Sequence, residues 1–266
     1  MRSFVVVGTI ILVLTSISMI YDVESSISDG TCNVAVLPAE GTILPYHGIG
    51  DFEMIITPET IESFMKSAEE DDSIKGVLVE INSPGGTPVA SERIAERFRN
   101  SDLPVVGMIG DQAASGGYMI AAATDYLIAS PMSDIGSIGV NMSYIEESVK
   151  NEEDGLTYVQ LTTGKFKDTG SPNRPITEEE KELLQKELDV VHNYFIDLVT
   201  KYRNLERDKV VAMADGSSML GQRALDNGLI DSLGGRVEAK ATFARILEID
   251  EAEVSFCEYE GGFLPF

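Results

Sequence analysis

Short apolar runs alternate with amphipathic helical patterns in the first half of the chain, and this alternation constrains the fold more than any other feature of the sequence. Three runs have the length and composition of strands buried in a parallel sheet, namely GVLVEI at 76–81, VVGMI at 105–109 and YLIA at 126–129. Helical patterns follow the first two runs, from about residue 88 to 99 and directly after residue 115. Because strands that alternate with helices favour βαβ units with right-handed crossovers, the sequence predicts an α/β core.

Further elements are expected on both sides of this core. Thr57 and Pro58 predict the start of one helix, and Thr177 with Glu180 forms a capping box that opens the longest helix. A first strand is expected at 33–37; it should end at Pro38 and resume past Gly41. Two more strands are expected at 137–140 and 158–161, with surface helix and loop between them at 143–155. A stripe on the longest helix is broad enough to pack on the domain or on a neighbouring subunit, and it includes Leu184, Leu188, Val191, Phe195, Leu198 and Val199.

The N-terminus carries a membrane signal. Residues 4–20 are almost all apolar or small hydroxyl residues, near the lower length limit for spanning a bilayer. Arg2 precedes the run and acidic residues follow it, so the positive-inside rule places the rest of the chain outside the cytoplasm. No persuasive A-x-A site follows, which favours an uncleaved single-pass anchor over a signal peptide. The expected organisation is an anchor or signal sequence at 1–24, a spacer at 25–32, one domain at 33–248 and an unassigned tail at 249–266.

Charge and cysteine content exclude other classes of site. The chain has 44 acidic and 20 basic residues, a net charge of −24, and cannot readily supply the Lys/Arg surface that nucleic-acid binding needs. Its two cysteines, Cys32 and Cys257, form no CxxC pair, which argues against a metal–thiolate site. We therefore expect no metal and no cofactor. Outside the cytoplasm the two cysteines could form a disulfide, although the sequence does not show that they meet.

The motif ASGG contains a candidate nucleophile, Ser115. Its small residues and glycine pair predict a tight turn from strand to helix, with the Gly116 amide at the helix N-terminus, where developing negative charge is favoured. The motif NSPGG at 82–86 follows a central strand and could supply a second oxyanion donor. Either motif alone could be an ordinary turn, but their combination favours nucleophilic catalysis.

A serine nucleophile also needs a base. The only histidines, His47 and His192, lie in no recognisable motif, so a Ser-His-Asp triad is disfavoured. The alternative is a lysine whose pKa is lowered by burial. The segment TTGKFKDTGSP supplies two lysines, Lys165 and Lys167, although each, taken alone, is more typical of a surface charge.

Four motifs, in this order and spacing, resemble the signal peptide peptidase A family, also called protease IV: INSPGGTPVAS, AASGGYMIAAATDYLIASPMSDIGSIGV, TTGKFKDTGSPNRPITEEE and GQRALDNGLIDSLGG. The likeness covers most of residues 33–236, and the chain looks like the short, single-repeat, membrane-anchored form. It is more distantly similar to the Clp protease and crotonase folds. The resemblance therefore implies a Clp/crotonase-like core of repeated βαβ units with an N-terminal transmembrane helix.

The resemblance also implies a serine-type endopeptidase with a Ser-Lys dyad. Matching the motifs residue by residue implies that Ser115 is the nucleophile and Lys167 the general base, with Lys165 as the less favoured base. The oxyanion hole would consist of the Gly86 and Gly116 amides. Proteolysis would proceed through an acyl-enzyme that water then hydrolyses.

Family members form homo-oligomers in which adjacent domains or protomers contribute the serine and the lysine. The resemblance thus implies that the two residues lie apart in one chain, with Ser137 of GSIG as a candidate for orienting the lysine. The implied substrates are hydrophobic peptides, such as signal-peptide remnants and membrane-protein fragments, bound as an added strand. Two alternatives stay open: an inactive membrane scaffold of the same fold, and a crotonase-type acyl-CoA enzyme, which would not require the serine. The acidity and the polar stretch at 143–155 depart from the family pattern and leave substrate preference open.

Overall fold

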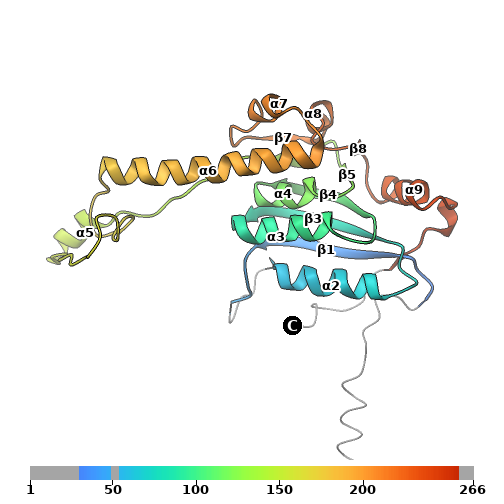
Figure 1. Ribbon diagram of the computed structural model, residues 1–266, viewed down its shortest axis with the longest axis horizontal. Coiled ribbons are helices and arrows are strands. Elements are labelled where there is room, and N and C mark those ends of the chain that lie inside the picture. Colours follow the sequence, from blue (N-terminus) through green and yellow to red (C-terminus); the bar gives the residue numbers. More distant parts are fainter. Residues whose placement is uncertain (1–29, 49–53, 258–266) are drawn as a thin grey trace, which may run out of the picture.

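The computed structural model describes residues 30–48 and 54–257, and a nearly all-parallel sheet lies at its centre (Figure 1). The main strand order is β2-β1-β3-β4-β5-β8, while β6 pairs with β4 and β7, and β9 pairs with β1. Every pairing is parallel except that of β6 with β7. The described strands are β1 (Val34–Ile43), β2 (Ile55–Ile56), β3 (Gly76–Gly86), β4 (Val105–Ala114), β5 (Tyr126–Ala129), β6 (Asp134–Gly136), β7 (Ser218–Leu220), β8 (Ser232–Leu233) and β9 (Phe256–Cys257). The predicted mixed α/β fold is confirmed.

Helices cover both faces of the sheet, because successive strand side chains point to opposite faces. Alternate residues such as Leu37 and Val79 pack against α2, α3, α4 and the C-terminal part of α6, whereas Val36 and Leu78 pack against α9. The described helices are α2 (Pro58–Glu70), α3 (Pro88–Arg99), α4 (Gly116–Ala122), α5 (Ser148–Glu153), α6 (Glu178–Arg203), α7 (Arg207–Val211), α8 (Gly221–Asn227), α9 (Arg236–Leu247) and the 3₁₀ turn η1 (Glu251–Glu253).

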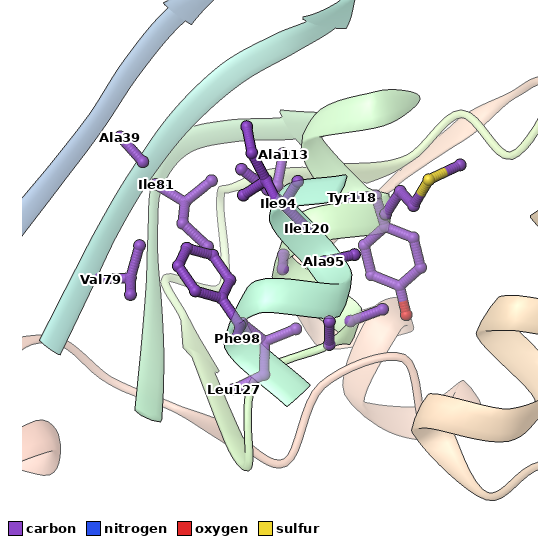
Figure 2. Packing of buried hydrophobic residues seen from close by; sticks show 14 of the residues in the cluster. Ala39, Val79, Ile81, Ile94, Ala95, Phe98, Ala113, Tyr118, Ile120 and Leu127 are labelled. Atoms are coloured by element: carbon purple, nitrogen blue, oxygen red, sulfur yellow. The ribbon is translucent and has the colours of Figure 1, made fainter. Parts of the chain in front are cut away.

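The short helix α4 is anchored in the core. Figure 2 shows Tyr118 and Ile120 of α4 packed beside Ile94 and Phe98 of α3. All four side chains are buried, and the Tyr118 hydroxyl donates a 2.8 Å hydrogen bond to the Leu229 carbonyl. Burial raises the pKa of Tyr118, so its hydroxyl stays protonated and can keep donating. The N-terminus of α4 is consequently a fixed point of the fold.

Several sequence predictions of local structure hold. Thr57 caps α2 with Pro58 in its first turn, and Thr177 and Glu180 form the predicted capping box of α6. The polar stretch at 143–155 contains α5 within surface loop. The first strand continues past Gly41 as predicted, but it runs from Val34 to Ile43 without the predicted end at Pro38. The strand passes through Pro38 because, among the described residues, one edge of β1 has no strand partner between its pairings with β9 and β2, and a residue without an N–H is tolerated at such an edge.

Two predicted strands were wrong. The sheet strand β6 ends just before 137–140, because Ser137, with a φ of 48°, departs from the extended conformation of a regular strand. Residues 158–161 form no strand, and the Val159 and Leu161 side chains are 73% and 92% exposed. These residues have strand-forming side chains, but within the described chain no neighbouring strand lies beside them to complete a ladder.

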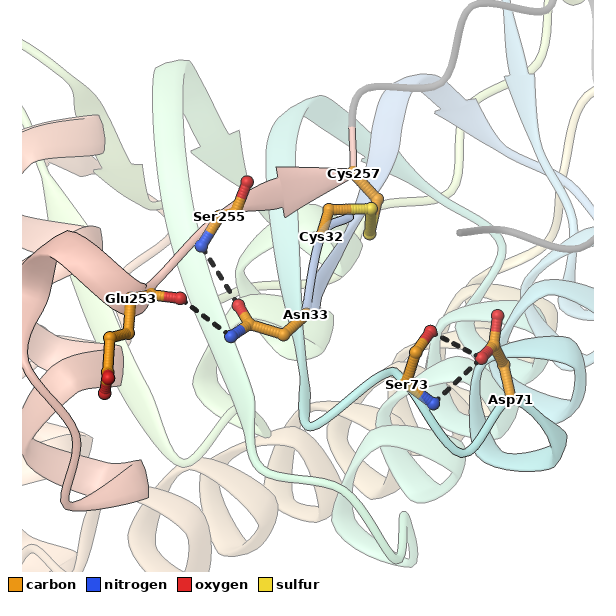
Figure 3. The surroundings of a disulfide bond; sticks show 7 residues. All are labelled: Cys32, Asn33, Asp71, Ser73, Glu253, Ser255 and Cys257. Atoms are coloured by element: carbon orange, nitrogen blue, oxygen red, sulfur yellow. Dashed lines mark hydrogen bonds between the residues drawn. A yellow bond between two sulfur atoms is a disulfide. The ribbon is translucent and has the colours of Figure 1, made fainter. Parts of the chain in front are cut away.

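The two ends of the described chain meet at the amino edge of the sheet (Figure 3). Cys32 and Cys257 form a disulfide, which brings together residues 225 positions apart. Beside it, the Asn33 side chain donates to the Glu253 carbonyl at 2.9 Å and accepts from the Ser255 amide at 3.0 Å. Part of the unassigned tail therefore belongs to the domain, where β9 pairs with β1.

Residues 141–177, together with the N-terminal half of α6, project from the body of the domain as an arm (Figure 1). The buried apolar residues of α6 are confined to its C-terminal half, at Phe195, Ile196, Leu198 and Val199. Among residues 30–48 and 54–257, no helix combines the length and the apolar character needed to cross a bilayer. The anchor predicted at 1–24 lies outside the described residues.

Candidate active site

Ser115 occupies a strained turn between β4 and α4. Its φ and ψ are 52° and −124°, a backbone conformation that residues other than glycine rarely adopt and that clusters at functional sites. The Ser115 amide donates a 2.8 Å hydrogen bond to the Gly136 carbonyl, which fixes the turn to β6. The side chain is half-buried, and its hydroxyl forms no hydrogen bond with any residue that the structure describes. The serine hydroxyl is therefore held at the carboxyl edge of the sheet without an acceptor of its own.

Two backbone amides converge beside this serine. Gly116 is the first residue of α4, so its amide has no acceptor within the helix. The Thr87 amide donates to the Ile43 carbonyl of β1, and since successive strand amides point to opposite edges, the Gly86 amide faces away from β1. A Cβ atom placed on Gly116 would lie 3.2 Å from the Gly86 nitrogen, which shows how closely the two backbones approach. The structure therefore brings together the backbone segments that carry the two predicted oxyanion donors.

Gly85 makes this approach possible. It has a φ of 107°, and a Cβ atom there would lie 2.9 Å from both the Ser115 Cβ and the Gly116 nitrogen. A side chain at this position would thus collide with Ser115 and strain the backbone. The Gly85 amide itself donates to the Ser83 hydroxyl at 3.1 Å, which leaves Gly86 as the NSPGG amide available to a ligand.

Ser137 lies at the position on β6 that corresponds to Ser115 on β4. Ala114 pairs with Gly136 in the ladder, so the two serines are the next residues beyond the ends of neighbouring strands. The Ser137 hydroxyl donates to the Gly216 carbonyl at 3.1 Å. Its oxygen keeps lone pairs that can accept a proton from an amine.

The two candidate lysines differ in their surroundings. Lys165 forms an ion pair with Glu179 at 2.8 Å and lies over the Phe166 ring. Lys167 is exposed, and its amine has no ion-pair or hydrogen-bond partner in the described part of the chain. The segment that carries both lysines belongs to the arm, which projects away from α4 (Figure 1). One chain therefore does not bring either lysine to Ser115.

An ion network that sequence reasoning missed fixes the segment after Lys167. The Arg174 guanidinium binds the Asp168 carboxylate at 3.0 Å and the Glu180 carboxylate at 2.6 Å, and Glu180 is buried. These hydrogen bonds, together with those from Thr177, hold the pKa of the Glu180 carboxyl well below its usual range. The capping box was the visible signal, but the arginine partner of its glutamate was not predicted.

Neither histidine takes part in the site. His47 lies beside α2, where its ring is 3.4 Å from the Thr60 hydroxyl, and His192 lies on α6. Within the described residues, no hydrogen bond joins either ring to Ser115. This geometry does not support a Ser-His-Asp triad.

Comparison with known proteins assigns the chain to a family. The sequence pattern of peptidase family S49 matches residues 97–250, a stretch that contains Ser115, Ser137 and Lys167. This chain belongs to peptidase family S49. The resemblance to the signal peptide peptidase A family is thereby confirmed.

Similar proteins occur in archaea and bacteria. A candidate protease of Methanocaldococcus jannaschii is 36% identical over 72% of this S49 chain and 62% of its own length. A candidate signal peptide peptidase of Enterococcus faecium is 34% identical over 71% of the chain and 56% of its own length. Protease 4 of Haemophilus influenzae is 34% identical over 77% of the chain and 33% of its own length. The chain thus matches less than two thirds of each of these relatives.

Proposed function

We propose that this S49 chain is a serine endopeptidase in which Ser115 and Lys167 form the catalytic dyad. The observation that carries the proposal is the close packing of the strained Ser115 turn against the Gly85–Gly86 backbone at the carboxyl edge of a parallel sheet, where α/β proteins bind ligands. Family membership supports peptide hydrolysis over acyl-CoA chemistry, which would have no need for the serine. The strained backbone at Ser115, a feature that clusters at functional sites, favours this proposal over a silent scaffold.

The chemistry follows from these groups. The Lys167 amine takes the proton from the Ser115 hydroxyl as the hydroxyl oxygen attacks the scissile carbonyl carbon. The Gly86 and Gly116 amides donate to the oxyanion that forms, and the lysine returns the proton to the leaving amine. A water molecule, activated by the same lysine, then hydrolyses the acyl-enzyme. The Ser137 hydroxyl accepts a hydrogen bond from the lysine amine and orients it.

A second copy of the chain supplies the lysine in this proposal. The arm has apolar side chains exposed to solvent, among them Ile145 at 80% and Leu161 at 92%. Contact with a neighbouring protomer would remove this apolar surface from water and bring an exposed Lys167 to the Ser115 turn of the neighbour. A homo-oligomer with shared active sites accounts for both the exposed surface and the separated dyad.

Substrate class and location are part of the same proposal. Hydrophobic peptides, such as signal-peptide remnants and membrane-protein fragments, would bind in an extended form along the sheet edge beside Gly86. The apolar run at 4–20 would anchor the chain in the cell membrane with the catalytic domain outside the cytoplasm. The disulfide between Cys32 and Cys257 supports a location of the domain outside the cytoplasm, since disulfides persist in oxidising compartments.

Hydrolysis of a fluorogenic hydrophobic peptide by the detergent-solubilised full chain tests the proposal. The wild type should cleave the peptide, and Ser115→Ala and Lys167→Ala should each be inactive. Co-expression of the two variants should recover about one quarter of wild-type activity, because one shared site in four pairs an intact serine with an intact lysine. An inactive wild type would contradict the peptidase. Active variants would contradict the dyad, and inactive mixtures would contradict the shared site.

A further inference from the structure

We propose that Ser83 is a positioning residue that holds the Gly86 amide in register with Ser115, an inference that rests on the proposed peptidase function. The Ser83 side chain is fully buried. Its hydroxyl donates a 2.7 Å hydrogen bond to the Gly41 carbonyl of β1 and accepts one from the Gly85 amide at 3.1 Å. One hydroxyl therefore connects β1 to the end of β3, which carries the proposed oxyanion donor Gly86.

The hydroxyl acts where the regular ladders of the sheet are interrupted. The pairing of β1 with β3 shifts register between Glu40 and Thr42, and the pairing of β3 with β4 shifts between Ile81 and Ser83. Such shifts disrupt the local backbone hydrogen bonds and re-aim the residues that follow. The two hydrogen bonds of Ser83 bridge this interruption, so they define the path of the chain into Gly85 and Gly86.

Ser83 also contacts the helix that carries the nucleophile at its N-terminus. A Cβ atom placed on Gly117 of α4 would lie 2.6 Å from the Ser83 carbonyl oxygen. The Ser83 backbone is thus packed against α4, while Gly85, two residues on, is packed against Ser115. A change at Ser83 is transmitted to the separation between the Gly86 and Gly116 amides.

Such a change should weaken transition-state stabilisation more than substrate binding. Oxyanion donors act only when they lie within hydrogen-bond distance of the developing charge, and loss of one donor lowers kcat by about 100- to 1,000-fold. A displaced donor should lower it by less, about 10- to 100-fold. Because the donors contribute little to ground-state binding, KM should stay near the wild-type value.

The experiment compares two inhibitors of the full-length wild type and of Ser83→Ala. A peptide aldehyde forms a hemiacetal with Ser115 whose oxygen occupies the oxyanion hole, whereas the matching peptide alcohol binds without a covalent bond. In Ser83→Ala the aldehyde should bind about 10- to 100-fold more weakly and the alcohol should bind as in the wild type. The kcat for a fluorogenic peptide should fall in parallel with aldehyde affinity.

Ser133 provides a matched control for the loss of a buried hydroxyl. It is buried at the turn between β5 and β6, donates to the Gly110 carbonyl at 2.5 Å and accepts from the Ser130 amide at 3.1 Å. Ser133→Ala removes the same two types of hydrogen bond as Ser83→Ala. It should lower thermal stability to a similar extent and leave the preference for the aldehyde unchanged.

Equal weakening of both inhibitors in Ser83→Ala, or an unchanged aldehyde preference, would overturn the proposal. If Ser83→Ala does not fold, Ser83→Cys retains a weak donor in the same place. An intermediate loss of aldehyde preference in Ser83→Cys supports the proposal, and wild-type preference overturns it. A wild type that neither cleaves peptide nor prefers the aldehyde overturns the peptidase itself, whereas an active wild type with an unaffected Ser83→Ala overturns only the role of Ser83.

Discussion

The amide of Ser115 donates a 2.8 Å hydrogen bond to the carbonyl of Gly136, and this bond joins two strand ends at which serines adopt positive φ. Ser115 has a φ of 52° and Ser137 a φ of 48°. The bond ties the backbone of Ser115 to the neighbouring strand, so the turn does not depend on the serine side chain for support. The hydroxyl is consequently available for chemistry.

Replacing Ser115 with glycine should stabilise the protein while removing its activity. A non-glycine residue in this conformation carries about 1 to 3 kcal/mol of strain, which glycine relieves. The greater entropy of glycine in the unfolded chain offsets about 0.5 to 1 kcal/mol, so the net gain should be about 1 kcal/mol. Thermal unfolding of wild type, Ser115→Gly and Ser115→Ala measures this gain in the free energy of unfolding.

Ser115→Ala is the control, because alanine keeps the Cβ and the strain but loses the hydroxyl. It should be as inactive as Ser115→Gly with no gain in the free energy of unfolding. Equal stability of the glycine and alanine variants would show that the turn is unstrained.

Lys167→Ala should lower kcat by at least about 1,000-fold, the scale expected when a nucleophile loses its base. Lys165→Ala should change kcat by less than about threefold. It leaves the proposed base in place, and its exposed ion pair with Glu179 contributes too little to stability for the loss to unfold the site. Steady-state hydrolysis by the two variants, at matched oligomer size, distinguishes the bases. A larger loss in Lys165→Ala than in Lys167→Ala would reverse the assignment.

The parts of the fold that the sequence predicted are those in which local pattern and tertiary packing agree. The runs that became β3, β4 and β5 are short, apolar and bounded by turn residues, and ASGG at the strand-to-helix junction needs only its own neighbours to be recognised. The segment at 158–161 has the same local character, but strand formation also requires a partner strand, which local sequence does not specify.

Relationships between distant residues were not predictable in this way. The bond from Ser83 to Gly41 spans 42 positions and depends on a register shift that no side-chain pattern encodes. The position of Lys167 relative to Ser115 follows from the direction of the arm, which the packing of α6 determines. The choice of Lys167 over Lys165 as the base came from family resemblance, and it stays a prediction.

Glu180→Gln should lower the thermal stability of the arm at neutral pH. The Arg174 guanidinium holds the pKa of the Glu180 carboxyl below its unfolded-state value, so the folded state favours the ionised form. This stabilisation is fully present above the unfolded pKa of about 4.3 and is lost as the pH falls towards the folded pKa. The difference in unfolding temperature between wild type and Glu180→Gln should therefore narrow below about pH 4, and thermal unfolding across a pH series measures it.

The neighbouring Glu179 supplies the control for this series. Its ion pair with Lys165 is exposed, so Glu179→Gln should match the wild type at every pH. A pH-independent difference for Glu180→Gln would attribute its effect to packing and not to the carboxylate charge.

Breaking the disulfide should destabilise the domain without impairing catalysis. Cys32 and Cys257 close a loop of 225 positions at the amino edge of the sheet, whereas Ser115 and Gly86 lie at the carboxyl ends of their strands. Loss of a native disulfide lowers the free energy of unfolding by about 2 to 5 kcal/mol. The double variant Cys32→Ser, Cys257→Ser should therefore unfold at lower temperature, yet keep its kcat at temperatures where it is folded.

Reduction with dithiothreitol distinguishes the effect of losing the disulfide from any effect of the two serine side chains. It should lower the unfolding temperature of the wild type to that of the double variant and leave the double variant unchanged. The link between β9 and β1 remains after reduction only through the short ladder and the hydrogen bonds of Asn33, so β9 amides should then exchange with solvent faster than those of β3 and β4. Equal protection of β9 before and after reduction would mean that the ladder and the Asn33 hydrogen bonds hold the C-terminal strand without the disulfide.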